Sequence, residues 1–277
     1  MIQFFFVGVG KCGTSWIHRY LTGRPEIGTP TLKETYFIDA GERRRERILR
    51  RLYEHRDGPL ADFSNVSYWD PDNPGEILAY NPDARVIVTV RRPSQRAVSH
   101  HHFLQRSGMI DEQPIADYLA AGDPEDIVAR SDYRPIIDRY HRAFGPDRVL
   151  VLPLELLASD PQAYADRLCT FLDIPPQALT EIERDPVLPA QRSRLRVVTR
   201  AGRAVASLLR RLGFLGVIGR VKGSSLAQRL LFVPAAGDDD ATAVAERHPQ
   251  LAELDRDYPS LLGELGLPVG VADQPAR

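Results

Sequence analysis

Lys11, Thr14 and Ser15 lie in a glycine-rich turn within the stretch FFFVGVGKCGTSW at residues 4–16. The apolar run before the turn predicts a buried strand, and the residues after it predict the start of a helix. Glycines let the backbone approach an anion closely, and the N–H groups at a helix N-terminus favour negative charge. The stretch therefore predicts a cradle for a phosphate or a similar anion, faced by one ammonium and two hydroxyls.

Two common nucleotide-binding motifs fit this turn only in part. A P-loop has a Ser or Thr for Mg²⁺ directly after its lysine, but Cys12 stands there. The glycines also match G-x-G-x-x-G, which requires a second strand and then an acidic residue about 20 residues on. Glu34 lies near that distance, but residues 22–33 contain prolines and no apolar strand. A P-loop kinase using ATP and Mg²⁺, and a nucleotide-binding module without catalysis, remain as alternatives.

A second candidate binding site lies in the stretch VIVTVRRPSQRAVS at residues 86–99. Its β-branched run predicts a buried parallel strand. Arg91 follows this run, at the edge where open α/β sheets bind ligands. A helix entered at Pro93 would bring the hydroxyl of Ser99 back toward Arg91. A fixed guanidinium and a hydroxyl together suit a phosphate monoester.

Three motifs together resemble those of sulfotransferases that use 3′-phosphoadenosine 5′-phosphosulfate (PAPS), above all the heparan-sulfate-type and related bacterial enzymes. The family's 5′-phosphosulfate loop, Lys-x-Gly-Thr-[Ser/Thr]-Trp, matches residues 11–16. Its 3′-phosphate motif, Arg-x-Pro-x-x-Arg-Ala-x-Ser, matches residues 91–99. The segment KETYFID at residues 33–39 is similar to its Lys-Glu-x-x-Phe-Phe segment. The three motifs follow one another in the family's order.

The resemblance implies an enzyme that moves the sulfonyl group of PAPS to a hydroxyl, or less readily an amine, by in-line transfer without a metal ion. It implies that Glu34 is the general base, that Lys11 faces the bridging oxygen and that Lys33 steadies the sulfonyl oxygens. Trp16 matches the family residue that stacks on adenine, and a place in the core is its alternative. The residues implied to bind PAPS, or its product adenosine 3′,5′-bisphosphate (PAP), are Lys11, Gly13, Thr14, Ser15, Trp16, Arg91 and Ser99.

The composition sets the expected architecture. A chain of 277 residues can hold one sizeable domain, and no apolar run reaches the roughly 18 residues of a transmembrane helix. We expect a single α/β domain over residues 1–277, with a central parallel sheet flanked by helices on a P-loop-like scaffold. The net charge of −1 argues against nucleic acid as a partner. The two cysteines suggest no disulfide framework, which favours the cytoplasm.

One segment, about residues 186–237, is basic: it contains ten arginines and lysines and no acidic residue. It is interpreted as a helical surface or lid, as a source of arginines that close over the donor or an anionic acceptor, or as an amphipathic helix at a membrane surface. The acceptor is left open among small molecules, glycans and lipids, as is the oligomeric state. The three histidines at 100–102 do not predict a metal site, because successive helical side chains point about 100° apart.

Overall fold

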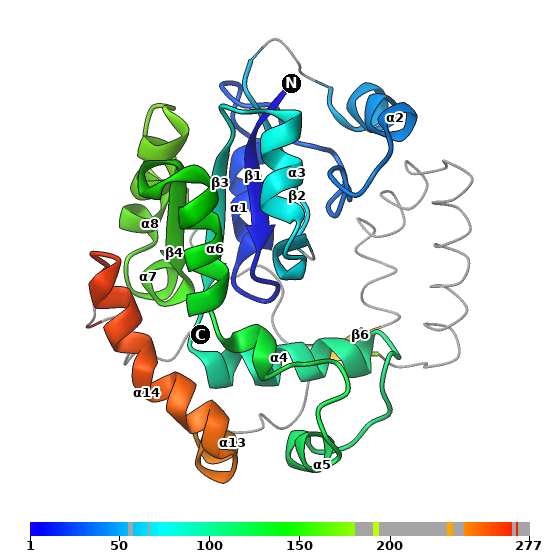
Figure 1. Cartoon of the computed structure of the whole chain (residues 1–277), viewed down its shortest axis with the longest axis vertical. Helices are drawn as coiled ribbons and strands as arrows, with labels where there is room; N and C mark the ends of the chain where they lie inside the picture. Colours follow the sequence, from blue (N-terminus) through cyan, green and yellow to red (C-terminus); the bar gives the residue numbers. More distant parts are fainter. Residues whose placement is uncertain are drawn as a thin grey trace.

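A four-stranded parallel sheet forms the centre of the molecule, in the order β2-β1-β3-β4 (Figure 1). The computed structural model describes residues 1–54, 58–65, 67–180, 191–193, 232–234, 241–267 and 270. Helices flank the sheet, so the predicted α/β class with a central parallel sheet is confirmed. The strands are β1 (Ile2–Gly8), β2 (Leu60–Phe63), β3 (Arg85–Val90) and β4 (Val149–Pro153).

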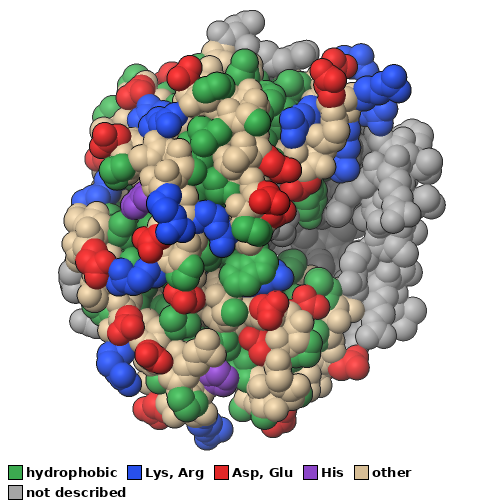
Figure 2. Space-filling view, in the orientation of Figure 1, with side chains coloured by type: hydrophobic (Ala, Val, Ile, Leu, Met, Phe, Trp, Pro, Cys, Tyr) green, Lys and Arg blue, Asp and Glu red, His purple; other side chains and the backbone are tan. Residues whose placement is uncertain are grey.

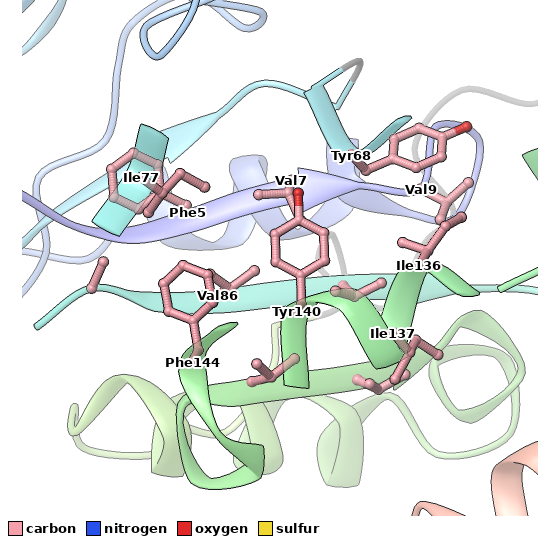
Figure 3. Packing of buried hydrophobic residues seen from close by; sticks show 14 of the residues in the cluster. Phe5, Val7, Val9, Tyr68, Ile77, Val86, Ile136, Ile137, Tyr140 and Phe144 are labelled. Carbon is pink, nitrogen blue, oxygen red and sulfur yellow. The ribbon is translucent and has the colours of Figure 1, made fainter. Parts of the chain in front are cut away.

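The central strand β1 is apolar along most of its length because both of its faces are buried. On one face, Phe5 and Val7 pack with α3 (Asn73–Tyr80) and α6 (Arg134–Phe144), as Figure 3 shows. On the other face, Phe4 and Phe6 share a second core cluster with residues of helices α1 and α8. Those two helices span Thr14–Thr22 and Pro161–Leu172.

Helix boundaries follow the turn and capping residues of the sequence. Helix α6 ends at Gly145, which has a φ of 79°. Helix α8 begins after Asp160, whose carboxylate accepts a hydrogen bond from the amide of Ala163 at 2.9 Å. The arginine-rich helix α2 spans Glu42–Leu52, and residues 55–57 lie outside the described part of the chain.

The turn from β3 into helix α4 (Pro93–Arg106) is fixed by two buried or half-buried carboxylates. Glu155 accepts hydrogen bonds from the amide of Arg92 at 2.6 Å and the hydroxyl of Tyr258 at 2.9 Å. Asp255 accepts from the amide of Ser94 at 2.8 Å and from its hydroxyl at 2.5 Å. The segments that carry these carboxylates are α7 (Leu154–Ser159) and α14 (Pro249–Glu264).

Helix α4 contacts three of the remaining described elements: β5 (Gln191–Ser193), α13 (Ala241–Arg247) and the 3-10 turn η2 (Ala129–Ser131). The short strands β5 and β6 (Phe232–Pro234) pair antiparallel. Apart from them, the predicted basic segment at about residues 186–237 lies outside the described residues. The other elements are α5 (Ile115–Ala120) and the 3-10 turns η1 (Ser67–Trp69) and η3 (Pro146–Arg148).

The described surface is mixed in charge. Figure 2 shows acidic and basic side chains interspersed over one face of the molecule. Within the described ranges, no helix combines the length and apolar character needed to cross a membrane.

Candidate active site

The predicted functional residues gather at one edge of the sheet. Because the four strands are parallel, their C-terminal ends meet at the same edge. The loop after β1 carries Lys11, the segment after β2 carries Asn65, and β3 leads into Arg91. The long connection after α1 brings Lys33 and Glu34 to this edge, as the contacts below show.

Gly13 shapes the turn between β1 and α1. It is the N-cap of α1 with a φ of 87°, a conformation that side chains rarely adopt. A Cβ atom there would lie 2.6 Å from Cδ1 of Leu154. The carbonyl of Gly13 accepts the first helical hydrogen bond, from the amide of Trp16 at 2.9 Å. The amides of Thr14 and Ser15 precede that bond and belong to the part of a helix that favours anions.

The hydroxyl of Thr14 connects the cradle to the segment at residues 33–39. Its Oγ1 accepts hydrogen bonds from Nζ of Lys33 at 2.6 Å and from Nδ2 of Asn65 at 2.9 Å. Because both partners are donors, the hydroxyl hydrogen of Thr14 remains for an acceptor such as a phosphate oxygen. The structure thus brings together Thr14 and Lys33, two predicted site residues that are 19 positions apart.

Glu34 lies in the same cluster. Its Oε1 is 3.5 Å from Nζ of Lys33 and accepts from Nδ2 of Asn65 at 2.7 Å. Its Oε2 accepts from the backbone amide of Asn65 at 2.6 Å. The carboxylate is therefore held on both oxygens beside the cradle, where a general base would have to lie.

A buried carboxylate ties the segment of Glu34 to strand β2. Asp62 accepts hydrogen bonds from the hydroxyls of Thr35 and Ser64, and Ser64 also accepts from the amide of Tyr36 at 3.1 Å. Burial raises the pKa of Asp62 to about 6, against the hydrogen bonds from Thr35 and Ser64. These contacts fix the backbone on either side of the predicted base.

Lys11 lies among other cations. Its Nζ is 5.0 Å from the ring centroid of Phe103 on α4. Burial, together with repulsion from Arg106, Arg91 and Lys33, lowers the pKa of Lys11 to about 8. Repulsion from three neighbouring cations means that basic groups converge here, as an anion site requires.

One row of side chains links Arg91 to Lys11. Nε of Arg91 donates to Oε1 of Gln95 at 3.2 Å. Gln95, Ser99 and Phe103 follow at helical intervals of four and share one face of α4. Arg91 and Ser99 are half-buried, and no hydrogen bond joins them in the part of the chain that the structure describes. Ser99 therefore lies on the face of α4 that reaches Lys11 through Phe103, and Arg91 contacts the first turn of that face through Gln95.

Trp16 lies in the hydrophobic core rather than at the surface. It is 3% exposed, stacks on Tyr20 with centroids 5.1 Å apart and meets Tyr164 edge-on at 5.6 Å. These surroundings favour the core alternative over stacking on adenine. Cys12 is buried as well, and burial raises the pKa of its thiol to about 12. The position that binds Mg²⁺ in a P-loop thus carries a neutral thiol.

The histidines after Ser99 do not converge. Nδ1 of His100 pairs with Nη2 of Arg96 at 2.8 Å, and burial lowers the pKa of His100 to about 3. His101 is buried beside Tyr118, with ring centroids 5.3 Å apart. In the described residues, no group of three or more His, Cys, Asp and Glu side chains is placed to hold a metal ion.

Sequence reasoning missed two residues that organise the site. Arg96 is fully buried and joins α4 to the carbonyls of Gly10, at 3.4 Å, and Ile127, at 2.8 Å. Asn65 holds Glu34 and Thr14 through the three hydrogen bonds given above. The sequence signal for Asn65 is its place two residues after the end of strand β2, and that strand was not predicted.

Comparisons with known proteins show the family and the fold. The family model for the sulfotransferase domain matches residues 2–194 of the chain. The chain belongs to this family. The human heparan sulfate glucosamine 3-O-sulfotransferase 6 is 27% identical to this sulfotransferase over 179 residues, or 62% of the present chain and 52% of the human protein. The chain thus spans about half the length of that relative.

A solved structure shows the same fold. The crystal structure of a sulfotransferase from Alicyclobacillus acidocaldarius has a TM-score of 0.59 at 24% identity, covering 68% of this chain and 87% of that one. The predicted membership of the sulfotransferases is confirmed by the family match. The three motifs that predicted it all lie within the matched residues.

Proposed function

We propose that this protein transfers the sulfonyl group of PAPS to an acceptor hydroxyl, with Glu34 as general base. The observation that carries the proposal is the cluster in which Lys33 and Glu34 meet Thr14 of the anion cradle. In this cluster a carboxylate, the ammonium of Lys33 and the first residue of a helix lie together, which suits attack on a group attached to a bound phosphate.

PAPS supplies an activated sulfonyl group attached through oxygen to its 5′-phosphate. The amides of the loop and the hydroxyls of Thr14 and Ser15 would hold that phosphate. Arg91 and Ser99 would hold the 3′-phosphate, and the charged guanidinium supplies directional hydrogen bonds. Family membership supports PAPS as the donor. The buried thiol of Cys12 supports a cradle that does not bind Mg²⁺ through the residue after its lysine.

The residues around the acceptor have separate tasks. Glu34 would take the proton of the attacking hydroxyl, and Lys33 would neutralise the sulfonyl oxygens. Lys11 would stabilise the charge that grows on the bridging oxygen as the S–O bond breaks.

The acceptor class to assay first is a glycan hydroxyl. The reason is that the name of the human relative specifies the 3-O position of glucosamine; lipids and small molecules come next. A cytoplasmic site of action remains a prediction from cysteine usage.

The Arg91→Ala substitution tests the 3′-phosphate site. A charge-assisted hydrogen bond contributes about 1.5–3 kcal/mol, so PAP affinity should fall roughly 10- to 150-fold. Isothermal titration calorimetry in EDTA measures this loss. Adenosine 5′-phosphate lacks the 3′-phosphate, and its affinity should stay the same in the variant.

The neighbouring Arg92→Ala variant is the matched control, since the motif assigns its side chain to no phosphate. An equal loss of affinity for PAP and adenosine 5′-phosphate in Arg91→Ala would contradict the assignment. So would a larger effect of Arg92→Ala than of Arg91→Ala.

The low pKa of Lys11 predicts a pH dependence of PAP binding. A bound anion favours the ammonium form, so the pKa of Lys11 rises above its free value of about 8 on binding, and a proton is taken up. Affinity should therefore fall as the pH rises above about 8, approaching tenfold for each pH unit. Titrations from pH 7 to pH 9.5 in buffers of different ionisation enthalpy measure affinity and proton uptake together. The Lys11→Met variant should lose this slope, and an unchanged slope would assign it to another group.

A further inference from the structure

Asn65 is a buried residue that donates hydrogen bonds to two predicted site residues, Glu34 and Thr14. It is 8% exposed and follows strand β2 at the edge of the sheet where the site lies. Its backbone amide donates to Oε2 of Glu34 at 2.6 Å, and its side-chain Nδ2 donates to Oε1 of Glu34 at 2.7 Å. The same Nδ2 donates to Oγ1 of Thr14 at 2.9 Å. One residue thus grips both oxygens of the carboxylate and the cradle hydroxyl.

The orientation of the Asn65 amide is determined by Glu34. An ionised carboxylate can only accept hydrogen bonds, so the NH₂ group, and not the carbonyl, must face it. This leaves Oδ1 of Asn65 buried, with no hydrogen-bond partner among the described residues. A buried acceptor without a partner destabilises a fold. The side chain of Asn65 is therefore oriented to donate to Glu34 and Thr14, although this orientation leaves its own carbonyl oxygen unpaired. Such a local energetic cost is typical of functional positions.

We infer that Asn65 is a positioning residue, which holds Glu34 at a fixed distance from the anion cradle. The inference rests on the proposed role of Glu34 as base. Through Nδ2, the carboxylate and the hydroxyl of Thr14 share one donor group, so the base and the group that faces the donor phosphate move together. Such placement matters because misplacement of a reacting group by about 1 Å costs on the order of 100-fold in rate.

The isosteric change Asn65→Asp separates this role from simple space filling. Asp keeps the shape of Asn and the backbone N–H donor, but its ionised side chain cannot donate to Oε1 of Glu34, and it places a second carboxylate beside the first. If Asn65 only filled space, Asn65→Asp would be nearly as active as the wild type. If it positions Glu34, kcat should fall in the order wild type, Asn65→Ala, Asn65→Asp, by about tenfold or more at the first step.

The readout is release of PAP from PAPS, with water and a glucosamine-containing glycan supplied as acceptors. PAP affinity, measured by calorimetry, shows whether each variant is folded and its cradle intact; in Asn65→Ala we expect it to stay within about threefold of the wild type. Asn65→Ala provides the measurement if the paired carboxylates of Asn65→Asp prevent folding. Asn81→Asp is the matched control, because Asn81 is a buried asparagine that donates to the carbonyl of Ile2 at 2.9 Å, far from the site.

A double-mutant cycle with Glu34→Gln completes the test. If Asn65 acts through Glu34, then Asn65→Ala causes little further loss once residue 34 is no longer a base. Losses that multiply, or full activity of Asn65→Asp, would overturn the inference and leave Glu34 as base. Full turnover in Glu34→Gln itself would overturn both the proposed base and the inference that rests on it.

Discussion

Replacing Glu34 by Gln is expected to lower kcat for sulfonyl transfer by about 10²- to 10⁴-fold, the usual contribution of a general base. The amide keeps the size of the carboxylate but cannot take a proton from the attacking hydroxyl. PAP affinity should change little, because the cradle at residues 8–15 and Arg91 remain intact. Release of PAP from PAPS under saturating donor measures kcat, and calorimetry measures affinity on the same preparation.

The control for this prediction is Glu76→Gln, an exposed carboxylate on α3. It should match the wild type in both turnover and affinity. If Glu34→Gln weakens PAP binding while kcat stays the same, the role of Glu34 is structural and another group accepts the proton.

The Lys11→Met substitution is the second change with a large expected effect. Met has a similar length but no charge, so the bridging oxygen loses the ammonium that stabilises its growing charge. Removing one such electrostatic contact typically costs about 10²- to 10³-fold in kcat. The affinity for PAPS should fall less than kcat, because this charge is larger in the transition state than in the bound donor. Single-turnover release of PAP at increasing PAPS concentrations gives both the rate of transfer and the affinity for PAPS, and so separates the two effects.

The control for Lys11→Met is Arg47→Met, which removes an exposed cation on α2. It should leave kcat and affinity unchanged. A loss of affinity for PAPS with kcat unchanged in Lys11→Met would show that Lys11 binds the donor without favouring the transition state.

The fold was predictable where each local signal agreed with the sheet. The apolar runs of β1 and β3 predicted buried strands, and the glycine-rich turn predicted the start of α1. Strand β2 was not predicted, because it has four residues and contains the buried Asp62. The carboxylate of Asp62 accepts hydrogen bonds from Ser64, two positions away, and from Thr35, 27 positions away in the sequence. A pattern read along the sequence cannot show such pairing.

The candidate site residues could be predicted from their match to the family motifs, but not from residue types and spacing alone. Lys11, Lys33 and Glu34 were placed together by resemblance, and the structure brings Lys33 and Glu34 to Thr14. The part played by Asn65 could not be predicted, since it depends on where the segment of Glu34 crosses the end of β2. The residue next to the motif hydroxyls, Trp16, has a local pattern that fits both core and ligand contact, and only packing distinguishes them.

The most direct measurement is to incubate the protein with PAPS in EDTA, with a glucosamine-containing glycan and water as acceptors, and to quantify PAP by chromatography. Parallel reactions contain ATP and Mg²⁺, with ADP as the product. We expect PAP to form in proportion to enzyme, to depend on Glu34, and no ADP to form. ADP formation from ATP and Mg²⁺, with PAPS left intact, would contradict sulfonyl transfer and indicate a P-loop kinase instead.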